Sequence, residues 1–508
     1  MKRTEFTPYG SNLGIVRLVR HASDPGLPIG LSRAGIERMV AARTIIDHAI
    51  THSLPVYGLT TGLGSQVDKR LSPEEQIDFS RTTIRGRAHA VGSPIARKIV
   101  RGAMIVRLNT LMSGASGASP GVAEMLHKCL EADLIPVVGS VGSIGASDLC
   151  LGATMGLALI GEGEMWGPDG ERMDAGTLLH KAGLSPLIPG PKDGLVLASH
   201  AGFGASMAAF GFLSAYRLYH CMQGCAAVTL EAIGNNPSMI ELPIMALSQH
   251  RDQRETAVQL RELLEGGQFI GGSRPGKVQD PLSIRNVAQV HGSLQMALRE
   301  SRETINAELN TVTDNPVVDI GNRRAVSSGG FFSSQLLLSM ETLSRALDLA
   351  LVVQVSRISK LLSGRFTGLP SNLVDSQPNR SGLSPLLKIA ESLLARCHRQ
   401  LAPSGIWPSV GADGTEDILS NVFERAESLK KGADMAYSLS AVELLLAVQA
   451  LELADRDDTA GLHVRELRDS VRSVVGRIGH ERSMTRDVET LARMMADGTL
   501  SGMDSQGC

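Results

Sequence analysis

Residues 416–455 read EDILSNVFERAESLKKGADMAYSLSAVELLLAVQALELAD, and this stretch decides the fold class. Its apolar residues recur at intervals of three and four positions, which is the spacing of one face of an α-helix. The same period runs through residues 286–312 and 333–362. All three stretches are longer than the usual helix of a globular domain. We therefore predict an all-α protein built on a central bundle of long helices, with a smaller N-terminal domain.

Segments rich in Gly, Pro and Ser interrupt the helical pattern and predict loops. They are residues 136–147, 184–194, 266–281, 313–332 and 402–415. Alternating runs typical of strands are scarce, and aromatic residues make up only 3% of the chain. We expect an N-terminal domain over residues 1–200, the long-helix bundle over 201–480, and a peripheral helix and tail over 481–508.

Charge and composition exclude several classes of partner. The 508 residues include 50 Lys and Arg against 52 Asp and Glu, a formal net charge of −2, so no broad electrostatic field favours nucleic acid. The first residues, MKRTEFTPYGSNLG, lack the apolar stretch of a secretory signal, and no uninterrupted apolar run reaches membrane-spanning length. We expect a cytoplasmic protein that acts on a small molecule, with no membrane partner.

The cysteines are scattered along the chain, which argues against a zinc site or a disulfide framework. They are Cys129, Cys150, Cys221, Cys225, Cys397 and Cys508. We expect buried free thiols and no metal site.

The loop GSVGSIGASDL at residues 139–149 is rich in glycine and precedes a helical stretch. A glycine-rich loop that enters a helix can bind phosphate. However, neither of the two common phosphate-binding patterns fits these residues, and no strand is predicted before them. The loop therefore needs another explanation.

That explanation comes from eight segments in a fixed order. They are VYGLTTGLG (56–64), PGVAEML (120–126), the loop at 139–149, KDGLVL (192–197), KVQDPLSIR (277–285), TDNPVV (313–318), SSGGFF (327–332) and GTED (414–417). Over nearly its whole length the chain resembles the histidine/phenylalanine ammonia-lyase superfamily. The resemblance implies an ammonia-lyase-like all-α fold, a carbon–nitrogen lyase activity, and a homotetramer of dihedral symmetry whose active sites are each assembled from three chains.

In that superfamily an Ala-Ser-Gly tripeptide cyclises into an electrophilic methylidene-imidazolone group. Alignment of the following helix without a gap places Gly145, Ala146 and Ser147 at the three positions, whereas a shift by one residue places Ala146, Ser147 and Asp148 there. Aspartate does not suit the tight ring closure that glycine allows. The sequence therefore predicts no cofactor, with a methylidene-imidazolone from Ala146-Ser147-Asp148 as the alternative.

This departure bears on the substrate. An α-amino group leaves poorly unless it first adds to an electrophile through its lone pair, whereas a quaternary nitrogen has no lone pair and already carries a positive charge. The resemblance therefore implies an ergothionase-like activity, which releases trimethylamine from ergothioneine and leaves thiourocanate. The alternatives are a histidine ammonia-lyase that forms urocanate and ammonia, and an inactive homologue with a binding or regulatory role.

Two residues match the catalytic groups of the superfamily. Tyr57, in the pattern Y-G-x-x-T-G-x-G, matches the tyrosine that removes the Cβ proton, although a lone tyrosine more often anchors a loop through its hydroxyl. Glu416, in GTED, matches a glutamate that contacts the imidazole side of the substrate. The alternative for Glu416 is an acidic residue at the start of a helix.

Substrate-binding residues follow from the segment at 277–285. Arg285 matches the arginine that binds the α-carboxylate, and a guanidinium is well suited to bidentate carboxylate binding. Its alternative is a surface charge. Gln279 is expected to line the same pocket, whereas Leu282 stands where histidine-specific relatives carry tyrosine.

Further positions complete the expected site. Arg87 falls where the family's substrate-selecting histidine is expected, and His89 follows it, so either could face a ring or a thiolate. Ser199 and His200 replace an Asn-Gly pair that contacts the cofactor region in relatives. Phe332 matches an aromatic pocket residue, although plain core packing is an equal alternative.

Overall fold

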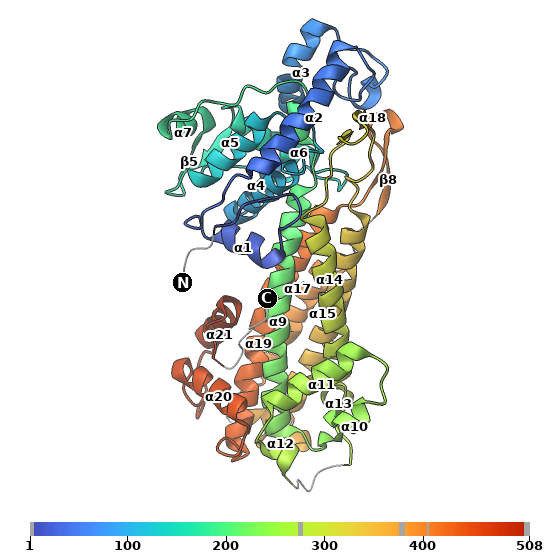
Figure 1. The fold of residues 1–508 in the computed structure, drawn as a ribbon. Coiled ribbons are helices and arrows are strands. Elements are labelled where there is room, and N and C mark those ends of the chain that lie inside the picture. The colour runs from blue at the N-terminus through green and yellow to red at the C-terminus, as the bar shows by residue number, and fades with distance from the viewer. Residues whose placement is uncertain (1–4, 273–277, 375–380, 404–405, 502–508) are drawn as a thin grey trace. The chain divides into compact units, whose positions relative to one another are not determined.

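The computed structural model describes residues 5–272, 278–374, 381–403 and 406–501 (Figure 1). Helices dominate it, which confirms the all-α prediction and the long-helix bundle. The chain divides into two compact units, each made of three separate stretches. Unit 1 comprises residues 1–210, 302–340 and 404–427, and unit 2 comprises residues 211–301, 341–403 and 428–508.

The contiguous division expected from the sequence differs from these units. The first 200 residues do belong to one unit, but two later stretches, 302–340 and 404–427, join them. These stretches include the predicted loop at 313–332 and most of the predicted loop at 402–415. Backbone hydrogen bonds connect both stretches to the N-terminal part. Val318 N donates to Ala115 O at 2.7 Å, and Ser420 N donates to Ile144 O at 2.9 Å. Long-range contacts of this kind leave no periodic mark in the sequence.

Unit 1 is a set of short and medium helices with small antiparallel sheets. Its helices are α1 (Ile15–Ser23), α2 (Arg33–Thr51), η1 (Gly64–Gln66), α3 (Pro73–Arg85), α4 (Arg97–Leu111), α5 (Pro120–Glu131), α6 (Leu149–Leu159), α7 (Ala175–Lys181), α8 (Asp193–Ala198), the start of α9 (Gly202–Ile233), and α18 (Gly411–Gly414). Its strands are β1 (Val91–Pro94), β2 (Ile135–Pro136), β3 (Gly139–Val141), β4 (Glu164–Trp166), β5 (Arg172–Asp174), β6 (Val317–Asp319), β7 (Arg324–Val326), β8 (Trp407–Val410) and β9 (Glu416–Leu419).

The strands pair locally as β1-β3, β2-β4-β5, β6-β7 and β8-β9. One part of the core lies where α2 packs on β6, through buried Ile45, Ile46 and Val318. Elsewhere, α3, α6 and α8 pack closely, and Gly152 and Gly194 permit this. A Cβ at Gly194 would lie 2.1 Å from the Ser80 carbonyl oxygen.

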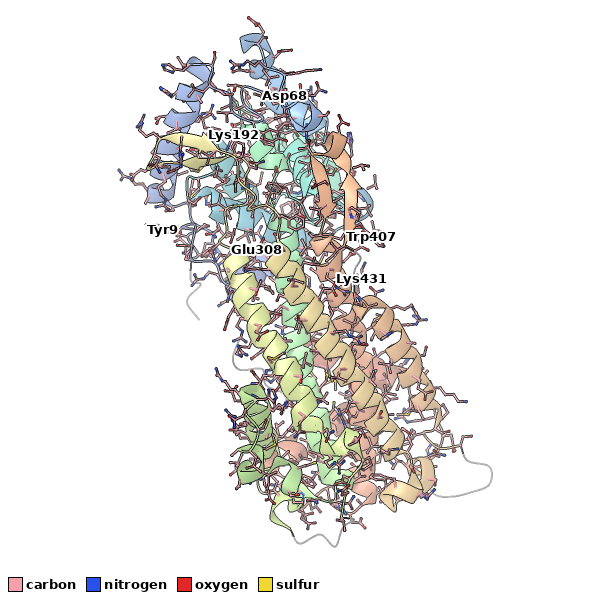
Figure 2. The ribbon with its side chains drawn as sticks, turned by 90° about the vertical axis from the view of Figure 1, so that its right-hand side faces the viewer. Tyr9, Asp68, Lys192, Glu308, Trp407 and Lys431 are labelled. Carbon is pink, nitrogen blue, oxygen red and sulfur yellow. The ribbon has the colours of Figure 1, made fainter. Side chains whose placement is uncertain are left out.

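Unit 2 contains most of the long helices. Its elements are the rest of α9, η2 (Pro237–Ile240), α10 (Leu242–Met245), α11 (Arg251–Leu263), α12 (Gln268–Gly271), α13 (Leu282–Arg285), most of α14 (Val287–Glu308), most of α15 (Ser334–Leu361), α16 (Gly364–Thr367), η3 (Ser371–Leu373), α17 (Pro385–Leu401), most of α19 (Val422–Leu453), α20 (Leu462–Val474) and α21 (Thr485–Asp497). Within this unit α9, α14, α15, α17 and α19 run side by side (Figures 1 and 2).

A fully buried ion pair joins two of these helices. Arg357 of α15 donates to both carboxylate oxygens of Glu443 of α19, at 2.6 and 2.9 Å. Thr229 of α9 donates to the same carboxylate at 3.0 Å, so three helices meet at one buried charge. Such networks tie neighbouring helices into one register.

Two helical stretches, Asp193–Ile233 and Val422–Leu453, are long and apolar enough to cross a membrane by length and composition alone. Their most apolar windows are 94% and 83% buried inside the protein. Their apolar surface is thus used in the protein core. In the described part of the chain, no group of three or more His, Cys, Asp or Glu residues is arranged to hold a metal ion.

The five cysteines that the structure describes form no disulfide. Cys129, Cys221, Cys225 and Cys397 are buried, and Cys150 is partly exposed. Cys508 lies outside the described residues.

Candidate active site

Unit 1 contains a cavity of about 660 Å³ that collects most of the predicted site residues. Six separate regions of the chain supply its walls, namely 57–67, 87, 146–149, 195–199, 315–332 and 412–418. The lining residues are Tyr57, Leu63, Gly64, Ser65, Val67, Arg87, Ala146, Ser147, Leu149, Leu195, Ser199, Asn315, Ser327, Gly329, Phe331, Phe332, Ala412, Thr415, Glu416, Asp417 and Ile418. The cavity therefore combines a phenol, a guanidinium, two carboxylates and two phenyl rings.

Tyr57 is held by the turn that follows α2. Gly58 has a φ of +64°, a conformation that glycine adopts without strain, and the chain then folds back through η1. As a result the backbone N–H of Gly64 donates to the Tyr57 hydroxyl oxygen at 3.0 Å. The tyrosine is partly buried and lines the cavity.

The glycine-rich loop forms another wall. Ser147 has a φ of +57° and accepts a hydrogen bond from the Ser199 hydroxyl at 3.0 Å. Ala146 forms an isolated antiparallel bridge with Phe332, which joins the loop to the segment at 327–332. Gly145 has a φ of +76°, and a Cβ there would lie 2.1 Å from the Ser420 hydroxyl oxygen. These contacts fix the loop in one conformation.

Asp148 holds the base of this loop at the start of α6. It is almost fully buried, and its carboxylate accepts from the Ser143 hydroxyl at 2.7 Å and from the Gly204 N–H at 2.8 Å. Burial raises the pKa of Asp148 to about 6, and those hydrogen bonds act in the opposite direction. Asp148 does not line the cavity, so its carboxylate supports the loop.

Arg87 and Glu416 face the same cavity from different elements. Arg87 lies in the turn after α3, and Glu416 is the exposed first residue of β9. Burial lowers the pKa of Arg87, whereas the charges of Tyr57, Glu416 and Cys150 raise it. Burial raises the pKa of the Cys150 thiol, because the charged form of a thiol is the deprotonated one. The four groups therefore lie close enough for their charges to interact.

A buried ion pair supports the loop that carries Asn315, Phe331 and Phe332. Arg107 of α4 donates to both carboxylate oxygens of Asp314, at 2.7 and 3.0 Å, and neither side chain is more than 2% exposed. The Arg107 guanidinium also donates to Val196 O at 2.6 Å, which ties α8 to the same group.

Lys192 supports the same loop from the N-terminal end of α8. Its buried ammonium donates to the carbonyl oxygens of Ser116 and Pro316. Burial lowers the pKa of Lys192 to about 8. Both polar supports lie behind the cavity wall, since neither lines the cavity.

The structure thus brings together Tyr57, Arg87, Ser199, Phe332 and Glu416. It does not bring all the expected residues there. His89 is exposed and does not line the cavity, and neither do Arg285 and Gln279. The last two lie in unit 2, where Arg285 donates to the Gln279 side-chain oxygen at 2.7 Å.

Other cavity residues were not singled out in the sequence. Asn315 lies within TDNPVV, Phe331 within SSGGFF and Asp417 within GTED, so each belongs to a segment that carries the resemblance. Their place in these segments was the sequence feature that could have identified them as site residues. Cys150 does not line the cavity, although its thiol acts on the charge of Arg87. It gave no signal in the sequence, because a cysteine in an apolar helix is usually a core residue.

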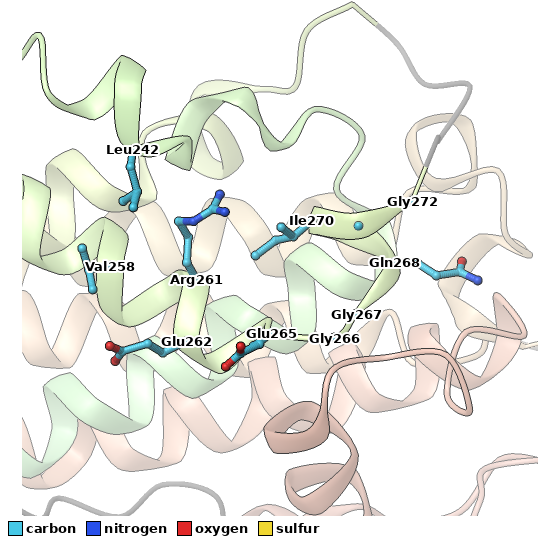
Figure 3. A pocket seen from close by; sticks show the side chains of 11 residues that line it. Leu242, Val258, Arg261, Glu262, Glu265, Gly266, Gly267, Gln268, Ile270 and Gly272 are labelled. Carbon is cyan, nitrogen blue, oxygen red and sulfur yellow. The ribbon is translucent and has the colours of Figure 1, made fainter.

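A second cavity, of about 550 Å³, lies in unit 2 (Figure 3). It is formed by α10, α11 and α12 and by the glycines around them, with Arg261, Glu262 and Glu265 at its walls. None of the residues predicted for the site lines it. We therefore place the candidate active site in unit 1.

Comparison with known proteins identifies the family of the chain. The family model for aromatic amino acid lyases matches residues 13–473. Histidine ammonia-lyases from Stigmatella aurantiaca and Symbiobacterium thermophilum are 30% and 31% identical, with 96% of this chain and 94% and 95% of those proteins covered.

Solved structures extend the comparison. Ergothionase from Treponema denticola, solved with desmethyl-ergothioneine sulfonic acid, is 25% identical with a TM-score of 0.93, over 98% of this chain and 99% of that chain. Histidine ammonia-lyase from Trypanosoma cruzi has a TM-score of 0.90 at 24% identity, over 98% of this chain and 94% of that chain, and shows the same fold.

These matches correct the expectation of an enzyme without a cofactor. The histidine/phenylalanine ammonia-lyases normally use a methylidene-imidazolone group formed from a segment of their own chain, and this chain matches their family model over most of its length. The prediction had been drawn from one tripeptide, and the family as a whole contradicts it.

The segment that would form the group is Ala146–Asp148. Its position agrees, because Ala146 and Ser147 line the cavity. Its third residue does not fit, since ring closure would use the Asp148 nitrogen, which donates to His200 O at 3.0 Å, and the Asp148 side chain is fixed by two further bonds.

The family match and the full-length relatives together show that the chain is a carbon–nitrogen lyase, a member of the aromatic amino acid lyase family within the histidine/phenylalanine ammonia-lyase superfamily.

Proposed function

We propose that this lyase eliminates the amine from an imidazole-bearing amino acid or betaine, and that its preferred substrate is a betaine of the ergothioneine type. The observation that carries the proposal is one cavity in which Tyr57, Arg87 and Glu416 meet beside Phe331 and Phe332. The pairing of a phenol with a carboxylate suits proton removal from a substrate whose ring must be held.

The proposed reaction begins at the Cβ carbon of the substrate. The Tyr57 phenolate takes the Cβ proton, and the electrons of that C–H bond form the Cα–Cβ double bond. The Cα–N bond breaks and its electron pair leaves with the amine, which gives a ring-substituted acrylate. The Gly64 N–H, at 3.0 Å from the Tyr57 oxygen, and the nearby Arg87 charge both stabilise a phenolate there.

Glu416 is proposed to hold the ring. A carboxylate that accepts a hydrogen bond from a ring N–H keeps the imidazole oriented and makes it a better acceptor of electrons, which acidifies the Cβ proton. Because β8 and β9 form one small sheet, with Trp407 opposite Leu419, the position of Glu416 is set by backbone pairing.

The rest of the cavity supports a cationic leaving group. Phe331, Phe332 and Asp417 also line the cavity. Aromatic faces and carboxylates are the groups that stabilise a quaternary ammonium, which has no N–H to donate. A trialkylammonium also departs as a neutral amine. The ergothionase of Treponema denticola, 25% identical over 99% of its length, supports the same substrate class.

A second candidate is a histidine ammonia-lyase, which would release ammonia and form urocanate. The relatives from Stigmatella aurantiaca and Symbiobacterium thermophilum favour it, at 30% and 31% identity over almost their full lengths. It uses the same base and ring contact, so the two candidates differ in the substituents on the leaving nitrogen and on the ring.

A substrate comparison separates these candidates. Purified protein is offered histidine, ergothioneine and hercynine, while the ultraviolet absorbance of the acrylate product is followed and the released amine is identified. We expect turnover of a betaine with release of trimethylamine. Turnover of histidine alone would favour the second candidate, and binding without turnover of any of the three would favour an inactive homologue.

We also propose that the chain acts in the cytoplasm as a homotetramer and that a second subunit supplies Arg285 and Gln279. In support, Arg285 donates to Gln279 and, within the described part of the chain, pairs with no carboxylate, so much of its guanidinium remains available to a substrate carboxylate. Light scattering gives the oligomeric state. Mixing inactive Tyr57→Phe and Arg285→Gln proteins should restore activity if sites are shared between chains, and failure of that rescue would contradict sharing.

A further inference from the structure

Arg87 presents an unpaired guanidinium to the cavity. The residue is partly buried and lines the cavity wall. Over residues 5–272, 278–374, 381–403 and 406–501, its guanidinium forms neither a hydrogen bond nor an ion pair. Arg85, two positions earlier, pairs with Glu162 at 2.6 Å. An unpaired cation that is partly withdrawn from water is costly, and a ligand that pairs with it would remove this cost.

The neighbours of Arg87 indicate which part of a ligand it would meet. Glu416 and Tyr57 both act on its charge, as does the Cys150 thiol. Glu416 is the group proposed to accept a ring N–H. Arg87 therefore offers hydrogen-bond donors beside an acceptor, on the side of the cavity where the ring is expected.

This pair of groups is complementary to a particular ring. An imidazole that carries sulfur on the carbon between its nitrogens presents an N–H donor next to an electron-rich acceptor. A plain imidazole has only a C–H at that carbon. The planar guanidinium presents several N–H donors in a fixed fork, which suits a large, weakly hydrated acceptor such as sulfur.

We propose that Arg87 determines ring specificity by binding an electron-rich sulfur on the carbon between the two ring nitrogens, while Glu416 accepts the adjacent N–H. The inference rests on the proposed function for the imidazole ring. It does not depend on whether the leaving nitrogen is methylated.

The experiment uses two substrate pairs whose members differ only in that sulfur. The pairs are ergothioneine with hercynine, and 2-thiohistidine with histidine. For each pair, kcat/KM is measured with the full-length wild type and with Arg87→Gln, Arg87→Lys and Arg85→Gln. Arg85→Gln is the matched control, because it removes a guanidinium of the same segment that is already paired with Glu162.

We expect Arg87→Gln to lower kcat/KM for the sulfur-bearing member by about 10- to 100-fold, the loss typical of one charge-assisted hydrogen bond. The sulfur-free member should lose less, because it loses only the effect of the Arg87 charge on the Tyr57 phenolate. The ratio of kcat/KM between the two members of each pair should therefore fall. Arg87→Lys should recover part of the loss. Arg85→Gln should leave the ratio of kcat/KM unchanged within each substrate pair.

An equal loss for both members of a pair would overturn the inference, since Arg87 would then act on the carboxylate or on folding. A ratio of kcat/KM between the two members that is the same in Arg87→Gln as in wild type would overturn the inference as well. If only 2-thiohistidine and histidine are turned over, the betaine proposal fails. The ratio of kcat/KM between these two substrates still decides the role of Arg87. If neither pair is turned over, the ratio of dissociation constants for ergothioneine and hercynine in wild type and Arg87→Gln decides it.

Discussion

The backbone N–H of Gly64 donates a hydrogen bond to the hydroxyl oxygen of Tyr57 across 3.0 Å. The glycine turn that carries Tyr57 thus also supplies a donor to its oxygen. A donor at this position stabilises the negative charge of a phenolate, which is the form that can remove a proton. The relationship gives a first prediction for the proposed base.

Replacement of Tyr57 by Phe should reduce kcat by about 100- to 10,000-fold, because the ring remains and only the proton-accepting oxygen is lost. Steady-state kinetics on the accepted substrate measures this loss, and circular dichroism checks that the helical content is unchanged. Tyr9→Phe serves as control, since Tyr9 lies outside the cavity and stacks under Arg38. Activity of Tyr57→Phe within tenfold of wild type would exclude Tyr57 as the base.

The buried Asp148 predicts a pH dependence of stability. Its pKa is raised from an ordinary 3.8 to about 6, mainly by burial. Below about pH 4 both the folded and the unfolded state bind the proton, whereas between about pH 4 and 6 only the folded state holds it. The free energy of unfolding should therefore fall as pH rises through this window, by at most about 3 kcal/mol.

Denaturant unfolding of wild type and Asp148→Asn across pH 4 to 7 measures this slope. We expect a smaller fall for Asp148→Asn, which does not titrate. Glu308, whose pKa is also raised by burial, contributes a fall of the same sign in both proteins. Identical pH profiles for the two proteins would show that Asp148 does not titrate differently in the folded and unfolded states.

Removal of the Arg107 charge should destabilise the protein strongly. Arg107→Met leaves the Asp314 carboxylate buried without its cation, and we expect a loss of about 3 to 5 kcal/mol in the free energy of unfolding. The double variant Arg107→Met, Asp314→Leu should recover part of that loss. Arg33→Ala is the control, because Arg33 and Glu37 form an exposed pair whose loss should change stability by less than about 1 kcal/mol. If the two substitutions lower the free energy of unfolding by strictly additive amounts, Arg107 and Asp314 do not interact directly.

Gly145→Ala should disturb the loop that carries Ala146 and Ser147. The new Cβ would meet the Ser420 hydroxyl and the Asn421 nitrogen, at 2.1 and 2.8 Å, on a backbone whose φ is +76°. We expect a fall in both Tm and kcat/KM. Gly170→Ala is matched in conformation, with a φ of +83° and nothing within 4 Å, so it should lose only about 1 to 2 kcal/mol in stability and no activity. Equal effects of the two substitutions would show that the contact with Ser420 is unimportant.

Much of the helical architecture was predictable because a period of 3.6 residues is a local property. The stretches 286–312 and 333–362 correspond to α14 and α15, at Val287–Glu308 and Ser334–Leu361. The stretch 416–455 was extended too far at its start. Residues 416–419 form β9, and α19 begins at Val422. The helix start was misplaced because Ser420 and Asn421 bond to Ile144 O, a contact that no local pattern reports.

The site was predictable where segments of the resemblance contribute residues to one cavity. Tyr57, Phe332 and Glu416 do so, although their separation along the chain gives no physical reason to expect it. Arg285 was predicted from the same kind of match but lies in the other unit. His89 shows the remaining difficulty, since the turn after α3 exposes it while Arg87 faces inward. The direction of a side chain in a turn depends on backbone angles that residue type does not fix.

The walls of the cavity come from residues as far apart as Tyr57 and Ile418. During synthesis, the ribosome must release Ile418 before the pocket can close, so the nascent chain spends most of translation without a binding site. Truncation upstream of β9 would yield a polypeptide that retains many helices yet lacks Glu416. Contacts of such high sequence separation also slow folding, so a newly made chain would acquire activity later than helical content.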